Sequence, residues 1–478
     1  MSLNLNRRVL ARARLGAVLA ACIALSSCGG GGGGQSPGQG EGAGGSAPPT
    51  GTPAPPPPPP SAVAAVQASA RPISGGAQDY SDILAAAAPA RRVLLGESTH
   101  GTAEYYRERG RITERLVMDQ GAGAVTIEGD WTPTFRVNLY VRGFGSDSSA
   151  AEALQGYSAR FPRWMWRNAQ FAEFVERLRA INLARPVEQR TGLYGMDVYD
   201  LYDAADQVVA YLRPRDPAAA NRVSDLYNCF ASFGRSGETY GQAVARRVDN
   251  CRDEAEAAVA EVGRIARPAD PEQAEYHFGA VRGAASVAAA EEYYRIAYAG
   301  NESSWNARDR RMEQTVEAAA LHAQALSGRQ GKTVSWSHNT HTGNAAATSM
   351  ASAGELNLGQ LMRQRHGEGA LLVGFFSYSG TVFAASQWGG EGQVFTMRPA
   401  IAGSHSALFH GAGIAAFSLL LRGNAALSSA LQPAMSQRAI GVVYLPESEV
   451  QSHYIQARLS DQFDAVIFFD QSGAVTPL

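Results

Sequence analysis

The chain has only four cysteines among its 478 residues, and none of them forms a Cys-x-x-Cys pair or a zinc-finger spacing. A zinc finger and a thioredoxin-like redox motif are therefore excluded. The sequence also lacks a Gly-x-Ser-x-Gly elbow, a Walker phosphate loop and a dinucleotide-binding fingerprint. These absences disfavour a serine hydrolase built on a nucleophile elbow, and they disfavour nucleotide chemistry.

The chain also lacks an excess of charge of either sign. It carries 42 Lys and Arg against 44 Asp and Glu, and the two signs are interspersed along the sequence. A protein that binds nucleic acid usually shows a block or stripe of basic residues. We therefore do not expect nucleic acid as a partner.

No apolar run near the N-terminus is long enough for a permanent membrane helix. Four arginines precede the short apolar run 15–25, which is the pattern of an export signal. The run ends in Leu25-Ser26-Ser27-Cys28, which resembles a bacterial lipobox with Cys28 as the lipidated residue. An ordinary signal peptide that ends near a chance cysteine is the alternative interpretation.

Residues 28–61 consist almost entirely of Gly, Pro, Ser, Ala and Thr. Such a segment cannot bury enough apolar surface to fold, so we expect a disordered tether. The predicted organisation is a lipoprotein signal peptide at 1–27, the tether at 28–61 and a globular domain at 62–478. A lipid anchor in a membrane would hold this domain at the periplasmic face of the outer membrane or at the cell surface.

Short apolar runs alternate with helical patterns along the globular part. Continuous apolar runs suit strands that are covered on both faces, and strand–helix alternation indicates a mostly parallel sheet. The fold class predicted is α/β, a three-layer helix/sheet/helix arrangement with a mostly parallel sheet. Ser379-Gly380 is a turn signal, so residues 382–385 are expected to form a hairpin with the strand before it. The expected strands are 92–96, 124–128, 191–198, 333–336, 370–376, 440–444 and 465–469.

Strand patterns vanish between about residues 201 and 325, where Ala, Glu, Arg and Gln dominate. We predict an inserted helical lobe over this range, packed against the α/β layers. Cys229 and Cys251 lie in it, and in an oxidising export compartment they favour a disulfide that closes a loop of roughly 20 residues. Two free buried thiols are the alternative. The expected helices of the lobe are 203–212, 217–230, 240–265, 271–298 and 304–326.

Ionisable side chains cluster where several expected strands end. Glu97 and His100 follow the first strand, and His338 and His341 follow a later one. Polar groups at the carboxyl ends of parallel strands meet in one crevice, so a single shared site is the simplest inference. Glu128 and Asp197, at two further strand ends, are expected there as well.

Imidazoles beside carboxylates can hold a general base that activates a water molecule. Each residue alone also has a structural interpretation, since a strand-end His is often only hydrogen bonded and a Glu there can cap a helix. Ser98 is a nucleophile in principle, but its position favours a role in the turn. Direct attack by an activated water is therefore the simpler mechanism.

Several ordered motifs resemble the erythromycin esterase family. They include Gly96-Glu97-Ser98-Thr99-His100-Gly101, Glu128-Gly129-Asp130-Trp131, Asn306-Ala307-Arg308-Asp309 and Trp336-Ser337-His338-Asn339-Thr340-His341. The resemblance implies a helix-covered parallel sheet with a helical lobe over the cleft. It also implies hydrolysis of a cyclic ester by activated water, with a small-molecule ester or lactone as substrate, and neither a cofactor nor a metal is expected.

The resemblance also implies a role for each matching residue. His100 would be the general base and Glu97 would orient it or the water. Arg109 would stabilise the oxyanion or pair with a carboxylate, and Glu128 matches the second acidic position. His338 and His341 are the candidates that protonate the leaving alkoxide. We assign three further residues to substrate binding, namely Asp130, Trp131 and Asp197.

Two other functions remain open at this point. Glu97, His100, Glu128, His338 and His341 are also residue types that bind zinc or manganese, so a metal-dependent hydrolase is one alternative. The other is a non-catalytic lipoprotein that binds haem or another ligand, although the chain lacks a Cys-x-x-Cys-His attachment motif.

Overall fold

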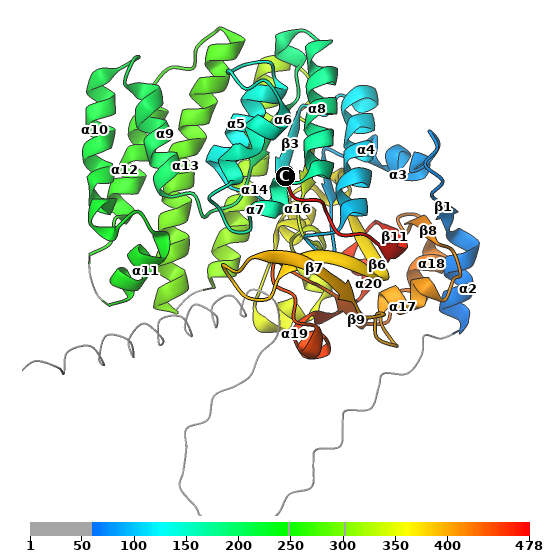
Figure 1. Cartoon of the computed structure of the whole chain (residues 1–478). Helices are drawn as coiled ribbons and strands as arrows, with labels where there is room; N and C mark the ends of the chain where they lie inside the picture. The colour runs from blue at the N-terminus through cyan, green and yellow to red at the C-terminus, as the bar shows by residue number, and fades with distance from the viewer. Residues whose placement is uncertain (1–59, 247–248, 301–302) are drawn as a thin grey trace, which may run out of the picture.

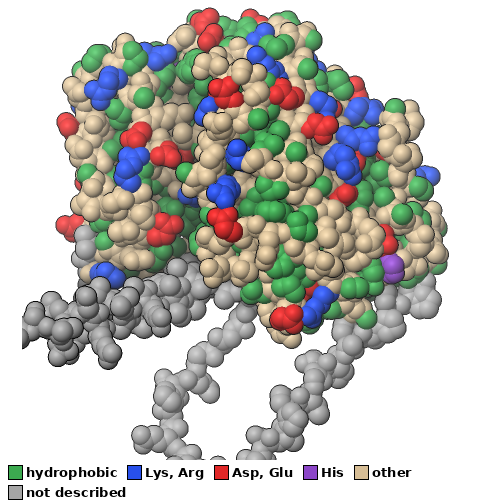
Figure 2. Space-filling model, viewed as in Figure 1, with side chains coloured by type: hydrophobic (Ala, Val, Ile, Leu, Met, Phe, Trp, Pro, Cys, Tyr) green, Lys and Arg blue, Asp and Glu red, His purple; other side chains and the backbone are tan. Residues whose placement is uncertain are grey.

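The computed structural model describes residues 60–246, 249–300 and 303–478 (Figure 1). The predicted signal peptide, Cys28 and nearly all of the predicted tether lie outside these residues. None of the helices within the described ranges is long and apolar enough to cross a membrane. On the face shown in Figure 2, charged side chains of both signs are scattered and do not gather into a block of one sign.

The centre of the molecule is a nine-stranded sheet in the order β1-β8-β11-β6-β2-β5-β3-β4, with β7 paired to β6. The six strands from β11 to β4 are parallel to one another. The antiparallel pairs are β1 with β8, β8 with β11, and β6 with β7. The bounds of the nine strands are β1 Arg71–Pro72, β2 Arg92–Leu95, β3 Ala124–Ile127, β4 Gly192–Gly195, β5 Thr333–Trp336, β6 Ala370–Ala385, β7 Gly392–Met397, β8 Ala416–Leu420 and β11 Ala465–Ser472.

Side chains alternate between the two faces of the sheet, and both faces are buried. On β2, Val93 and Leu95 join one apolar cluster while Leu94 joins another on the opposite face. Because both faces of the sheet are buried, the strand sequences are mostly apolar and do not alternate with polar residues in a regular way. This arrangement confirms the predicted mostly parallel sheet between helical layers.

Helices α3 to α8 cover one face of the sheet, and α2 together with α14 and several later helices covers the other. The first layer comprises α3 Ser81–Ala87, α4 Ala103–Gln120, α5 Trp131–Val141, α6 Ala150–Ala153, α7 Arg163–Trp166 and α8 Ala169–Leu183. The second comprises α2 Pro60–Ser69, α14 Ser304–Ser327, α16 Leu358–His366, α17 His405–His410, α18 Ala425–Ala430 and α20 Leu459–Gln462. Two short helices, α15 Asn339–Thr342 and α19 Glu449–Ser452, lie in connecting segments.

Five helices form a separate lobe with its own apolar core beside the sheet (Figure 1, green). Cys229 and Cys251 form a disulfide in this lobe, with 5.8 Å between their Cα atoms. The single helix expected over 240–265 is instead two helices that end and begin on either side of residues 246–251. The helix expected over 304–326 is not part of the apolar core of the lobe, because α14 packs against the sheet. The lobe helices are α9 Tyr202–Leu212, α10 Pro217–Tyr227, α11 Gly237–Ala245, α12 Arg252–Gly263 and α13 Pro271–Ala299.

Two of the strand predictions are wrong. Residues 440–444 form no strand, and they make two isolated bridges, Ile440 to Thr99 and Val443 to Ala385. The turn expected at Ser379-Gly380 does not occur either, because β6 continues through it to Ala385 and pairs with β7. Gly380 has φ of +118°, and its backbone contacts Ser472 on β11, so this glycine serves close strand packing.

Several strands were not predicted from the sequence. They are β1, β7, β8 and a small antiparallel pair, β9 Met435–Arg438 with β10 Tyr454–Ala457. All of them are short or lie near the edges, where the apolar pattern is weak.

Candidate active site

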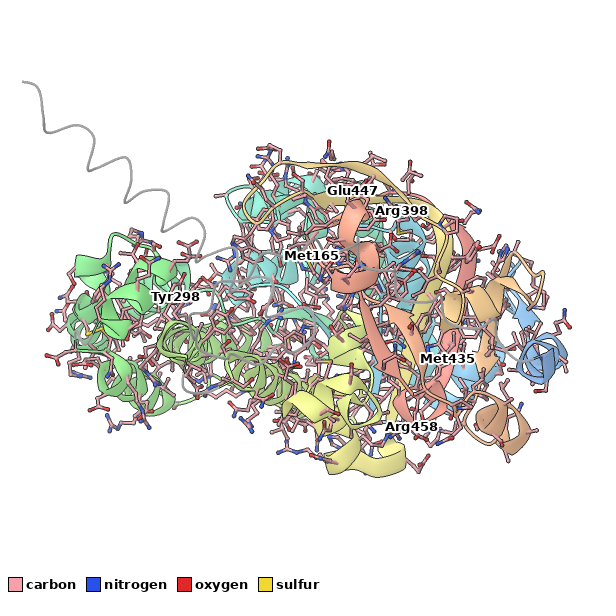
Figure 3. The ribbon with its side chains drawn as sticks, turned by 90° about the horizontal axis from the view of Figure 1, so that it is seen from below. Met165, Tyr298, Arg398, Met435, Glu447 and Arg458 are labelled. Carbon is pink, nitrogen blue, oxygen red and sulfur yellow. A yellow bond between two sulfur atoms is a disulfide. The ribbon has the colours of Figure 1, made fainter. Side chains whose placement is uncertain are left out.

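A pocket opens at the carboxyl ends of the parallel strands. It has an empty volume of about 810 Å³, which includes its open mouth. Met165 of α7 lines it, and Figure 3 shows this residue between the lobe that carries Tyr298 and the C-terminal segment that carries Glu447. The candidate residues that line the pocket are His100, Glu128, Asp130, Asp197, His338 and His341.

Glu97 and His100 form a hydrogen-bonded pair directly after β2. The Nδ1 atom of His100 lies 2.9 Å from Oε1 of Glu97. A carboxylate accepts, so Nδ1 carries the proton, and the lone pair of Nε2 is left for the pocket. Burial disfavours a charged ring, yet the hydrogen bond to Glu97 and the charges of Glu128 and Glu97 outweigh it and raise the pKa of His100 above its usual value.

Arg109 lies behind this pair and does not line the pocket. Its Nη2 donates to Oε2 of Glu97 at 2.7 Å, and the guanidinium lies 4.8 Å from the ring centre of Tyr106 and 4.9 Å from that of Trp336. Both partners of the ion pair are fully buried. Of the two roles expected for Arg109, the structure shows the pairing with a carboxylate; its burial is incompatible with direct contact to an oxyanion.

His338 faces His100 with 5.0 Å between the ring centres. The amide and hydroxyl of Thr340 lie 3.3 and 2.8 Å from its Nδ1, and the amide can only donate. Nδ1 is therefore an acceptor and Nε2 carries the proton. Burial and the charge on His100 lower the pKa of His338 to about 3, so the ring is neutral. Nε2 has no hydrogen-bond partner among the described residues.

Glu128 holds this arrangement together from the end of β3. Its Oε2 accepts from the backbone amide of His338 at 2.7 Å, and its Oε1 accepts from Nη2 of Arg308 at 2.8 Å. Burial favours the protonated form, but the charges of His341, His100 and Arg308 outweigh it and lower the pKa of Glu128 below its usual range. Glu128 is thus an ionised carboxylate whose two oxygens are both occupied.

Arg308 is the main residue of the site to which the sequence interpretation gave no role. It projects from α14 and also binds both oxygens of Asp197 at 2.8 Å. Its Nη1 lies 3.0 Å from Nε2 of His341, whose Nδ1 is 2.9 Å from Asp309. Trp305 stacks on the His341 ring at 4.3 Å. The signal was present in Asn306-Ala307-Arg308-Asp309, but a helical pattern alone does not say which turn faces the pocket.

Asp130 and Trp131 point in different directions. Asp130 lines the pocket and pairs with Arg160, whereas Trp131 is buried between Phe135 and Tyr194 and does not line it. Trp131 is therefore a core residue and its assignment to substrate binding is corrected. Burial raises the pKa of Asp130 to about 7, with Arg160 opposing the shift.

Ser98 does not line the pocket. It is 1% exposed, and its hydroxyl lies 2.8 Å from the hydroxyl of Tyr105. This contact agrees with the role in the turn that its position favours.

The donor groups do not fit a metal ion well. The carboxylate oxygens of Glu97 accept from Arg109 and His100. Those of Glu128 accept from Arg308 and the backbone amide of His338, and both ring nitrogens of His341 are engaged. In the described residues, no group of three or more His, Cys, Asp or Glu is arranged to hold a metal ion. We derive no step through a metal.

Comparisons with known proteins agree with the motifs. The family model for erythromycin esterase matches residues 117–472, a range that includes Glu128, Arg308 and His338 and begins after His100. In structure, the chain is similar to a succinoglycan biosynthesis protein (18% identity, 87% of this chain and 97% of that chain, TM-score 0.67). It is also similar to a protein from Bacillus cereus (17% identity, 87% of this chain and 98% of that chain, TM-score 0.67). A third similar structure is an erythromycin esterase mutant in its open conformation (16% identity, 83% of this chain and 95% of that chain, TM-score 0.55). At these identities the structural similarity shows the fold.

Proposed function

Because the chain belongs to the erythromycin esterase family, we propose that it hydrolyses an ester or lactone with a water molecule that His100 activates. Membership of the family supports a hydrolase. The observation that carries the proposal is the pairing of His100 with Glu97, which turns an unprotonated Nε2 toward a pocket. A base oriented by a second side chain is the arrangement that general base catalysis requires.

In the proposed first step, Nε2 of His100 takes a proton from water while the water oxygen attacks the ester carbonyl carbon. The carbonyl π electrons move to oxygen, which becomes an oxyanion. Nε2–H of His338 is an unpartnered donor beside His100, and it would bind this oxyanion. Such a donor is most effective when it is preorganised and shielded from water.

In the second step the oxyanion re-forms the carbonyl and the bond to the leaving alkoxide breaks. The proton held by His100 passes to that alkoxide, which restores the neutral base. His338 is poorly suited to donate this proton, because its lowered pKa keeps it neutral and its Nε2–H serves as a hydrogen-bond donor. His341 is engaged at both nitrogens, and its proposed role is to position Arg308.

The test is a screen of the purified chain against simple esters, small lactones and macrolactones, with product acids detected by mass spectrometry. The proposal expects hydrolysis of at least one class, and full retention of activity after chelator treatment. Activity that is lost with chelator and restored by zinc or manganese would favour the metal-dependent alternative. Absence of hydrolysis across the panel, with a visible absorption band on adding haem, would favour the binding protein.

A further inference from the structure

We propose that an acid-lined pocket beside the catalytic pocket binds a cationic group of the substrate, such as a protonated amine, with Asp130 as its principal acceptor. This second pocket has an empty volume of about 790 Å³ and shares Asp130, Arg160 and Tyr199 with the first. The inference rests on the proposed ester hydrolysis, and it specifies the substrate class. The ester would lie near His100 and the cation on the far side of Asp130.

Asp130 is available to bind a ligand because another residue caps the helix in its place. It occupies the N-cap position of α5, where an aspartate normally accepts from an amide of the first turn, but its side chain makes no capping bond. Asp200 caps α5 instead, since its Oδ2 accepts from the amide of Thr132 at 2.6 Å. The side chain of Asp130 therefore turns toward the two pockets.

One oxygen of Asp130 is free to accept. The residue is only 6% exposed, its Oδ1 has no hydrogen-bond partner among the described residues, and its Oδ2 faces Arg160. An unpartnered buried carboxylate oxygen is costly, so a ligand that donates to it gains more than an exposed ion pair would provide. The charged groups that act on Asp130 from neighbouring elements are Arg160, Asp197 and Asp200.

The balance of charge in the two pockets favours a cation. Six carboxyl side chains line them, against three guanidinium groups. A cleft in which one sign dominates concentrates ligands of the opposite sign. The carboxyl residues are Glu128, Asp130, Asp197, Asp200, Asp203 and Glu238.

Aromatic rings of the same walls already receive cations from the chain itself. Arg160 lies 5.1 Å and Arg308 lies 5.3 Å from the ring centre of Tyr199, and Arg235 lies 5.4 Å from that of Tyr202. Carboxylates combined with aromatic faces are the usual means by which proteins bind organic ammonium groups. Arg160, with 36% of its side chain exposed, occupies the position nearest to Asp130 and would compete with the ligand.

The test uses a charged and an uncharged probe of the same shape, cyclohexylmethylamine and cyclohexylmethanol, titrated calorimetrically into the full chain. A buffer of about pH 9 keeps the amine protonated and favours ionised Asp130 also in a variant without Arg160, whose charge lowers the pKa of Asp130. Wild type should bind the amine about tenfold more tightly than the alcohol. Asp130→Asn should remove this preference, and Arg160→Gln should increase it. Asp253→Asn, an exposed charge-matched control on α12, should leave it unchanged.

Two results would overturn the inference. One is equal affinity of wild type for the two probes; the other is a preference that survives in Asp130→Asn and does not increase in Arg160→Gln. Thermal melting checks that each variant is folded, and Arg160→Gln still tests the inference if Asp130→Asn is unstable. Binding needs no ester, so a charge preference without any hydrolysis would support the cation site and contradict only the proposed function.

Discussion

His100 is the residue on which the proposed chemistry depends. Its pKa is raised by Glu97 and Glu128, and only the unprotonated ring can accept a proton from water. The rate constant kcat/KM should therefore increase with pH and level off above the deprotonation of His100, with a midpoint above the usual histidine value of about 6.5.

Glu97→Gln provides the matched variant for this pH profile. Removing the negative charge withdraws the hydrogen bond to a carboxylate that stabilises the protonated ring, so the midpoint should move to lower pH. Kinetics on a neutral ester across the pH range would measure it. A midpoint that stays in place or rises would show that Glu97 does not act on His100.

His338 should affect the chemical step more than binding. Truncation in His338→Ala removes the proposed oxyanion donor, and loss of one such donor costs about 10²- to 10³-fold in kcat. KM should change little, and the pH profile should still show the deprotonation of His100 as its midpoint. A variant in which KM rises while kcat is unchanged would instead indicate a role in substrate binding.

How far the site could be predicted depends on where each residue lies. Glu97, His100, Glu128 and His338 directly follow apolar strands, and strand ends in a parallel sheet meet by geometry. Arg308 lies inside the long helix α14, and the spacing of residues in the sequence does not determine which side of this helix faces the pocket. Trp131, one position after a pocket residue, points into the core, because α5 begins there and turns it toward Phe135.

At the scale of elements, the buried pair of Arg109 and Glu97 fastens α4 to the end of β2. Arg109→Met should lower the free energy of unfolding by about 3–5 kcal/mol, since the carboxylate of Glu97 would remain buried without its partner. Urea denaturation followed by circular dichroism measures this change. Arg115→Met, on the exposed side of the same helix, is the control and should change stability by less than about 1 kcal/mol. Equal effects of the two substitutions would contradict the account.

The predicted and observed elements differ for identifiable reasons. The six central parallel strands, β2 to β6 and β11, were predicted because both of their faces are buried and their sequences are largely apolar. Residues 440–444 are equally apolar, but their pairing with the end of β6 is a single bridge between Val443 and Ala385, so they lie there as a loop. Apolar composition alone does not distinguish these two situations.

At the scale of the whole molecule, the helical lobe has its own core and its own disulfide. A double variant, Cys229→Ser with Cys251→Ser, should destabilise the lobe by about 3 kcal/mol, because the bridge no longer restricts the unfolded chain. Differential scanning calorimetry of the oxidised wild type and the variant would reveal the difference. Identical melting curves would show that packing alone determines the stability of the lobe.

The lobe also contributes to the proposed substrate site, because Tyr294 of α13 and Glu238 of α11 line the second pocket while the first pocket lies over the sheet. Under the proposed function, hydrolysis of a small uncharged ester would depend on the groups over the sheet, and discrimination between substrates would depend on the groups next to the lobe. The two functions are thus separable by substitution.

The most direct test of the central claim is the rate of ester hydrolysis by His100→Ala, compared with wild type and with His410→Ala. His410 is a half-exposed histidine that pairs with Asp470 away from the pocket. The account predicts that His100→Ala loses about 10²- to 10⁴-fold in kcat/KM while its melting temperature stays near that of wild type, and that His410→Ala keeps full activity. Turnover close to that of wild type in a folded His100→Ala protein would contradict it.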